Sequence, residues 1–182
     1  MDNPKILVHV CCAVCGAALT DFLKDKYEVV LFFYNPNIHP EEEYKKRKES
    51  VEKLAKIYGI TFIEGEYDKE NWFLKVKGLE TEPEGGKRCP VCFEMRLEKT
   101  ARLAKERGIK FFSTTLSMSP YKNEEAVGQI ADEIAKQMGL EFLDSGKLGL
   151  DKKQNWQKSR QLAREYNFYH QKYCGCQFSI RK

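Results

Sequence analysis

Residues 28–34, with the sequence EVVLFFY, form an almost uninterrupted apolar run that is too short for a helix and rich in β-branched and aromatic residues. A strand that is apolar on both faces is typical of a parallel sheet covered by helices on both sides. Comparable runs elsewhere in the chain predict further strands. We expect strands at residues 5–10, 60–64 and 110–115, with a short fifth strand at 141–143.

Helical patterns lie between these runs. Over residues 41–58, Tyr44, Val51 and Leu54 recur at helical spacing, and Gly59 stands where a helix would end. We expect further helices at 91–107, around 127–138 and in the last segment, and a polar loop at 65–90. Alternating strands and helices predict an α/β fold with an open, mainly parallel, twisted sheet of about five strands flanked by helices.

The length of 182 residues fits one domain spanning 1–182. The segment 145–182 carries nine Lys or Arg residues against Asp151 and Glu165, so its net charge is +7 and the rest of the chain carries −3. This basic, helical C-terminal segment indicates an anionic partner such as nucleic acid, or else a solvated helix face. We expect no membrane association, because no run approaches ~18 apolar residues, and no secretory signal.

Seven cysteines are many for a chain expected in the reducing cytoplasm, where structural disulfides are rare. They form three groups: CCAVC at residues 11–15, CPVC at 89–92 and CGC at 174–176. The first two groups open expected helices, where the helix dipole favours thiolates. Such groups favour an iron–sulfur cluster, structural zinc or redox chemistry, whereas some members, Cys15 first among them, could be inert core residues.

A disulfide between Cys174 and Cys176 would close a small, strained ring, and strained disulfides are the labile or catalytic kind. This pair therefore predicts an electron relay, with two more metal ligands as the alternative. His9 precedes the first group and either tunes a cluster from outside its ligand set or is a buried histidine satisfied by the backbone. No phosphate-binding glycine motif is present, which argues against ATP.

Five segments together resemble, in order, the QueH-type epoxyqueuosine reductases. They are HVCCAVC from His9, YNPNIHP from Tyr34, EPEGGKRCPVCFEMRL from Glu82, TTLSMSPYKN from Thr114 and YCGCQFS from Tyr173. The sequence departs from the family pattern at 145–154 and at His170, where an arginine is common. The resemblance implies a Rossmann-like fold of the nucleotide-hydrolase type and reduction of epoxyqueuosine to queuosine at the wobble position of tRNA with a GUN anticodon.

The resemblance further implies a 4Fe-4S cluster on Cys11, Cys12, Cys89 and Cys92, no cobalamin, and a redox-active pair at Cys174 and Cys176. An additional iron ion bound by Cys15, Cys174 or Cys176 is the competing idea. The electron donor is not identified by the sequence. The alternative function is a zinc-stabilised nucleic-acid-binding module without catalysis.

Two further sets of residues complete the expected site. Removing the epoxide oxygen as water requires a proton donor, and the candidates are Tyr34, His39 and Asp68. The anticodon loop would be held by cations and aromatic rings of the basic segment. These candidates are Lys152, Lys153, Arg160, Arg164, Trp156 and Tyr169, with the two aromatic residues expected to be exposed. The basic segment is expected to close the metal site.

Overall fold

The computed structural model describes residues 3–180 and contains one five-stranded sheet in which all neighbouring strands are parallel. The strands are β1 (Lys5–His9), β2 (Glu28–Phe33), β3 (Thr61–Glu64), β4 (Phe111–Thr114) and β5 (Glu141–Phe142). Their spatial order is β3-β2-β1-β4-β5. The predicted α/β class and parallel sheet are confirmed, including the short fifth strand.

The chain leaves the central strand β1 in one direction to build β2 and β3, and later returns to its other side to add β4 and β5. The strand order therefore reverses between β1 and β4. At the carboxyl end of β1, His9 pairs in register with Phe32 of β2 and with Thr114 of β4. In open parallel sheets this switch point opens a crevice in which ligands bind.

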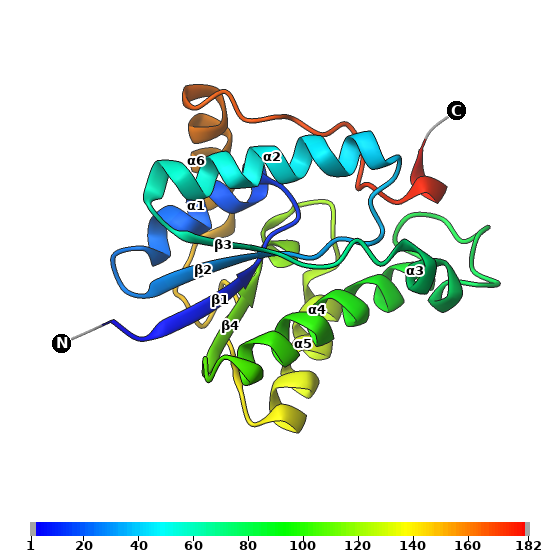
Figure 1. The fold of residues 1–182 in the computed structure, drawn as a ribbon, viewed down its shortest axis with the longest axis horizontal. Helices are drawn as coiled ribbons and strands as arrows, with labels where there is room; N and C mark the ends of the chain where they lie inside the picture. Colours follow the sequence, from blue (N-terminus) through cyan, green and yellow to red (C-terminus); the bar gives the residue numbers. More distant parts are fainter. Residues whose placement is uncertain (1–2, 181–182) are drawn as a thin grey trace.

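Helices cover both faces of the sheet (Figure 1). They are α1 (Ala13–Leu23), α2 (Glu41–Tyr58), α3 (Lys69–Lys75), α4 (Arg88–Glu106), α5 (Glu124–Met138) and α6 (Lys152–Glu165), with short 3-10 turns η1 (Thr115–Met118) and η2 (Gln177–Ser179). Helices α1, α2 and α6 lie over one face, while α4 and α5 pack together over the other.

The two apolar layers alternate along each strand. In β1, Ile6 and Val8 belong to the layer under α1 and α2, while Leu7 belongs to the layer under α4 and α5. All three side chains are fully buried. Burial on both faces explains why the central strands read as continuous apolar runs.

Helix α2 shows how closely local sequence sets an element here. Three glutamates occupy its first turn and Lys56 its last turn, which complements the helix dipole. Gly59 ends it in the left-handed conformation with φ 64°. The bounds of α2 are those predicted from the sequence.

One expectation about the fold is wrong. The polar segment 65–90 is not all loop, because it contains α3 and the first residues of α4. Asp68 caps α3 through its side chain, and Trp72 in that helix is 1% exposed. A single buried aromatic residue among charged neighbours leaves no helical apolar repeat, so the periodicity could not reveal α3.

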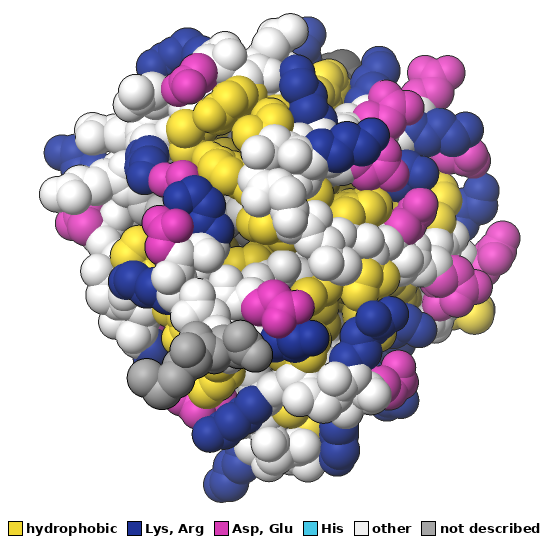
Figure 2. All heavy atoms as spheres, turned by 60° about the vertical axis from the view of Figure 1, so that its left-hand side comes forward, with side chains coloured by type: hydrophobic (Ala, Val, Ile, Leu, Met, Phe, Trp, Pro, Cys, Tyr) yellow, Lys and Arg dark blue, Asp and Glu magenta, His cyan; other side chains and the backbone are white. Residues whose placement is uncertain are grey.

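Among residues 3–180, no helix is long and apolar enough to cross a membrane. Arg181 and Lys182, which contribute to the charge of the C-terminal segment, lie outside the described residues. The face shown in Figure 2 carries Lys or Arg and Asp or Glu side chains close together, with apolar patches between them. That face shows no extended patch of one charge.

Candidate thiol site

Cys11, Cys12 and Cys15 form the thiol triad, the only group of this kind that residues 3–180 contain. Their Sγ atoms all lie within 4.8 Å of one another, and all three residues are buried. They come together because β1 ends one turn before α1 begins. Cys12 is the N-cap of α1, and its Sγ accepts a hydrogen bond from the Cys15 amide at 3.3 Å.

The three thiols share charge unequally. Hydrogen bonds from Cys12 and Cys15 lower the pKa of Cys11 well below its usual value. Burial raises the pKa of Cys12 to about 12, and the hydrogen bond with Cys11 raises that of Cys15. The triad thus concentrates negative charge on Cys11, whose amide and Sγ both contact the Thr115 hydroxyl, at 3.2 and 3.4 Å.

His9 holds the strand ends beneath the triad. Its Nε2 donates to the Tyr34 carbonyl at 3.1 Å, so its Nδ1 must accept from the Thr114 hydroxyl at 2.9 Å. That hydroxyl in turn accepts from the Leu116 amide. Burial lowers the pKa of His9 to about 3, so the ring is neutral. Both ring nitrogens of His9 thus bond to residues 34 and 114, as expected of a buried histidine whose partners lie within the protein.

The other four cysteines belong to, or pack against, the apolar layer under α4 and α5, and we call them the second thiol group: Cys89, Cys92, Cys174 and Cys176. Cys89 is half-buried, and its Sγ accepts from the Gly85 amide at 3.2 Å. Cys92 is buried, and its Sγ accepts from Nη1 of Arg96 at 3.6 Å. None of the seven cysteines forms a disulfide in this structure.

The CGC segment is held against the loop after β2. The His39 amide donates to the Gly175 carbonyl at 2.8 Å, and Ile38 pairs with Cys176 in an antiparallel bridge. Arg47 donates to the carbonyls of Cys174 at 3.1 Å and Tyr173 at 2.8 Å. Contacts to the backbone of this segment, from residues 38 and 39 and from the Arg47 side chain, therefore fix its position.

Gly175 is required where it stands. Its φ is +104°, and a Cβ atom there would lie 2.8 Å from Cγ1 of Ile38. Both the backbone conformation and the close approach exclude a larger residue. A glycine is therefore needed between the two cysteines, because the segment packs closely against Ile38.

A cavity of about 880 Å³ connects the two thiol groups. Cys11 and Cys15 line it on one side and Cys174 on another. Several charged and aromatic side chains share its wall: Arg47, Tyr121, Lys122, Trp156, Arg160, His170, Lys172 and Tyr173. The C-terminal segment supplies many of these, and Nε2 of Gln171 reaches Cys12 Sγ at 2.9 Å.

The three expected proton donors lie elsewhere. Asp68 caps α3 through hydrogen bonds from Asn71, and Tyr34 is 2% exposed, with burial raising its pKa to about 12. Burial lowers the pKa of His39, whose Nε2 has no partner among the described residues. None of the three lines the cavity as residues 3–180 define it.

The expected RNA-binding residues differ in whether they line the thiol cavity. Trp156 and Arg160 line the cavity, and Lys153 and Arg164 are exposed on α6. The expectation that both aromatic residues are exposed is wrong. Trp156 is half-buried against the core, and Tyr169 is half-buried because its hydroxyl donates to Glu43 at 2.6 Å.

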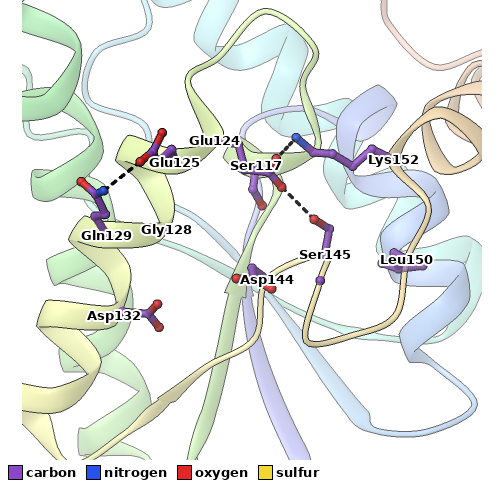
Figure 3. A pocket seen from close by; sticks show the side chains of 11 residues that line it. Ser117, Glu124, Glu125, Gly128, Gln129, Asp132, Asp144, Ser145, Leu150 and Lys152 are labelled. Atoms are coloured by element: carbon purple, nitrogen blue, oxygen red, sulfur yellow. Dashed lines mark hydrogen bonds and ion pairs between the residues drawn. The ribbon is translucent and has the colours of Figure 1, made fainter.

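Lys152 faces a different cavity, of about 520 Å³, beside α5 (Figure 3). It pairs there with Glu124, which also accepts from the Ser145 hydroxyl at 2.7 Å. Glu125, Asp132 and Asp144 line the same cavity. Lys152 lines this cavity and not the thiol cavity. The acidic residues around it would repel a polyanion such as RNA.

Sequence reasoning missed five residues of this region: Arg47, Arg88, Arg96, Tyr121 and Gln171. Arg96 stands four residues after Cys92, so helical spacing alone could have placed the two on one face of α4. Arg88 adjoins Cys89 and is 1% exposed. Nothing local in the sequence marks Gln171 or Arg47, whose partners are distant in the chain.

The expected cluster ligands were Cys11, Cys12, Cys89 and Cys92. The structure brings the first two together with Cys15, and it places the other two across the cavity region in the second thiol group. A parallel sheet with three buried thiols at its switch point places this chain among α/β proteins with a ligand or metal site at the carboxyl ends of the strands. Comparisons with known proteins identify which kind.

The family model for "Epoxyqueuosine reductase QueH" matches residues 6–182. A QueH protein of Thermotoga maritima is 39% identical over 181 residues, covering 96% of this chain and 90% of that protein. One of Acinetobacter baylyi is 39% identical over 189 residues, covering 99% and 83%. The chain belongs to the QueH family of epoxyqueuosine reductases, and it is an oxidoreductase that acts on tRNA.

A search of solved structures finds the U34-tRNA thiolase NcsA from Methanococcus maripaludis with its [4Fe-4S] cluster. It is 11% identical to this chain with a TM-score of 0.49, and the match covers 91% of this chain and 68% of that one.

Proposed function

We propose that this enzyme converts epoxyqueuosine to queuosine at the wobble position of tRNA with a GUN anticodon, without cobalamin, in the cytoplasm where that tRNA is found. Family membership supports the reaction. The observation that carries the site assignment is the single cavity lined by Cys11 and Cys15 of the triad and by Cys174. It brings two groups of thiols to one substrate-sized space.

The reaction removes the epoxide oxygen and leaves an alkene. Both carbon–oxygen bonds break, two electrons and two protons are taken up, and the oxygen leaves as water. The dithiol of Cys174 and Cys176 holds two electrons and two protons, which it releases when a sulfur–sulfur bond forms between them. The two changes balance, and an external reductant of unidentified nature would restore the dithiol.

The residues present fit an iron–sulfur group. Thiolates are the ligands that such clusters use, and the triad offers three buried sulfurs within 4.8 Å of one another. We assign Cys11, Cys12, Cys89 and Cys92 as ligands of a 4Fe-4S cluster. Such a cluster, when bound, would supply electrons one at a time at a potential that side chains alone do not reach.

The position of Cys15 supports an alternative ligand set, because its Sγ lies within 4.8 Å of those of Cys11 and Cys12. In that set Cys15 binds the cluster in place of one cysteine of residues 89–92, or it binds an additional iron together with Cys174 or Cys176. Counting iron and sulfide in the seven single Cys→Ser variants distinguishes these sets.

The cavity wall suits an unpaired anticodon loop. Lys122, Arg160 and Lys172 offer charges to phosphates. Trp156 is one aromatic surface, and Tyr121, at 81% exposed, is another on the opposite loop. Base stacking on exposed aromatic rings is how proteins hold splayed nucleotides. Lys153 and Arg164 extend the basic surface along α6.

Loss of the epoxide oxygen as water requires a proton donor close to the substrate. Asp68, His39 and Tyr34, proposed from the sequence, would have to act from outside the cavity wall. His170 and Lys122 line the cavity itself and are better placed. The thiol protons of Cys174 and Cys176 already satisfy the proton balance, so a separate acid would serve to direct the order of transfer.

The decisive experiment combines anaerobic purification with turnover. Protein reconstituted with iron and sulfide should be brown, hold about four irons per chain as a 4Fe-4S cluster requires, and reduce epoxyqueuosine in tRNA that carries a GUN anticodon. Cys174→Ser should abolish turnover while iron content stays. Colourless protein with stoichiometric zinc, unable to reduce this tRNA, would overturn the proposal.

A further inference from the structure

Three arginines are buried in this protein: Arg47 at 2% exposure, Arg88 at 1% and Arg96 at 3%. A guanidinium keeps its charge at any physiological pH, so it cannot become neutral when buried. Each buried charge must therefore be balanced by an opposite charge or by a full set of acceptors. The three arginines differ in how this is achieved.

Ordinary protein groups balance Arg47 fully and Arg88 in part. Nε of Arg47 pairs with the Glu43 carboxylate at 2.7 Å, and its two terminal nitrogens donate to carbonyls. Nη1 of Arg88 donates to three backbone carbonyls, those of Leu79 at 2.8 Å, Glu80 at 3.1 Å and Glu82 at 2.6 Å. Arg47 is thus explained by the protein alone, whereas Nη2 of Arg88 has no partner among the described residues.

Arg96 lacks such a balance. Its Nη2 donates to Oδ1 of Asn35 at 2.7 Å, and its Nη1 reaches Cys92 Sγ at 3.6 Å. Its Nε has no partner among the described residues. The ion pairs of residues 3–180 do not include Arg96. A full positive charge is therefore buried beside a neutral amide and a thiol.

The missing negative charge must come from inside the protein, because a side chain that is 3% exposed cannot reach a phosphate of bound RNA. Arg96 lies beside Cys92 of the second thiol group, since its Nη1 is 3.6 Å from the Cys92 Sγ. It is thus placed to act on that thiol. Thiolates that bind a metal group would supply the charge that the protein otherwise lacks.

We propose that Arg96 is a positioning residue whose permanent charge balances a metal-binding thiolate at Cys92, which strengthens metal binding there and makes a bound cluster easier to reduce. The inference rests on the proposed function, because it assumes that Cys92 holds a metal group. It assigns to Arg96 neither contact with tRNA nor a part in breaking the epoxide.

Three variants test the charge. Arg96→Met removes it while keeping the length of the side chain, and Arg96→Lys keeps it without the planar fork. Arg102→Met is the matched control on the same helix, since Arg102 is exposed and pairs only with Glu98. Asn35→Ala removes the neutral partner of Arg96 and isolates the structural contribution of that hydrogen bond.

The first readout is the affinity of the metal-free protein for Cd²⁺, followed through sulfur-to-cadmium charge-transfer absorption. We expect Arg96→Met to weaken it about tenfold or more, because a charged group at a thiolate contributes more than a neutral donor. Arg96→Lys and Arg102→Met should stay within about threefold of the wild type. The second readout is the reduction potential of the reconstituted protein. We expect it to be about 59 mV lower in Arg96→Met, which corresponds to a tenfold change in the equilibrium constant of a one-electron couple.

Unchanged Cd²⁺ affinity and potential in Arg96→Met would overturn the inference. So would an Asn35→Ala variant that matches Arg96→Met in both readouts, because the hydrogen bond would then explain the residue. If Arg96→Met does not fold, the test falls to Arg96→Lys, which keeps the charge but not the planar fork. The inference is then overturned if the Cd²⁺ affinity of Arg96→Lys is reduced as much as that of Asn35→Ala, because the charge alone would not have preserved metal binding. A wild-type protein that reconstitutes no cluster would instead refute the proposed function, which separates the two failures.

Discussion

The thiol triad and the second thiol group are built in opposite ways. The triad needs only the end of β1 and the first turn of α1, and Cys12 caps the helix that carries Cys15. The second group joins the start of α4 to the end of the chain, and side chains from distant elements hold it, above all Arg47. A site can thus combine one rigid local half with one half that depends on long-range contacts.

This difference suggests separate tasks. The triad is fixed by a strand end and a helix start, which suits a constant metal-coordination geometry. The CGC segment is held by a few contacts, so it can move when a disulfide between Cys174 and Cys176 forms or breaks. If the tasks are separate, damage to the second thiol group should spare the triad.

The largest effect is expected from replacing Cys174 and Cys176 together with serine. Turnover should fall by at least about 1000-fold, as when a group that acts as a unit in catalysis is removed. Iron content and absorption should match the wild type, because the triad is untouched. The corresponding Cys12→Ser variant should lose both iron and activity, and equal iron loss in the two variants would refute the division of tasks.

Arg47→Met should be the most destabilising single change in the segment that holds the second group. It leaves Glu43 as a buried carboxylate without its partner, and breaking a buried pair costs about 3–5 kcal/mol. Urea denaturation measures this change in the free energy of unfolding. The control Lys45→Met, which removes an exposed pair with Glu41, should change it by less than about 1 kcal/mol.

Gly175→Ala should displace the CGC segment at a cost of about 1–3 kcal/mol, because alanine is strained at this φ and collides with Ile38. Gly78→Ala is the matched control, since its φ is +85° and nothing lies within 4 Å of its added Cβ. Thermal unfolding and turnover should both separate the two. Similar losses in both variants would show that the backbone conformation alone matters.

Gln171→Leu should cost about 1 kcal/mol of unfolding free energy, since it removes the hydrogen bond to Cys12 and leaves the triad otherwise intact. Gln161→Leu, at an exposed position of α6, is its control. Chemical denaturation would detect the difference. No difference between the two would mean that the C-terminal segment contributes nothing to the triad.

The smallest effect concerns pH. Burial, then Lys69, lowers the pKa of His39 below 6.5 in the folded protein, so the unfolded chain binds the extra proton first. The stability that His39 contributes is therefore complete above pH 6.5 and is lost as the pH falls below it, by less than about 1.4 kcal/mol per unit. Denaturation at pH 7.5 and 5.5 should show a smaller loss in His39→Gln than in His170→Gln.

The same contrast explains what sequence could predict. Strands, most helices and the thiol triad follow from patterns a few residues long, such as the apolar run at β2 and the CCAVC group at the end of β1. Arg47 and Gln171 could not be found, because their partners, at residues 173, 174 and 12, adjoin them only after folding. The pairing of Lys152 with Glu124 could not be found either, because the basic residues around Lys152 carry no sign of an acidic partner 28 residues away in the chain.

The C-terminal segment has a consequence for how the enzyme is made. Cys12 is synthesised well before Gln171, which lies 159 residues later in the chain and contacts its Sγ. Earlier parts of a chain begin to fold first during synthesis. During translation the triad therefore exists before its cover, and Cys12 lacks the Gln171 contact until the segment that carries Gln171 has been made.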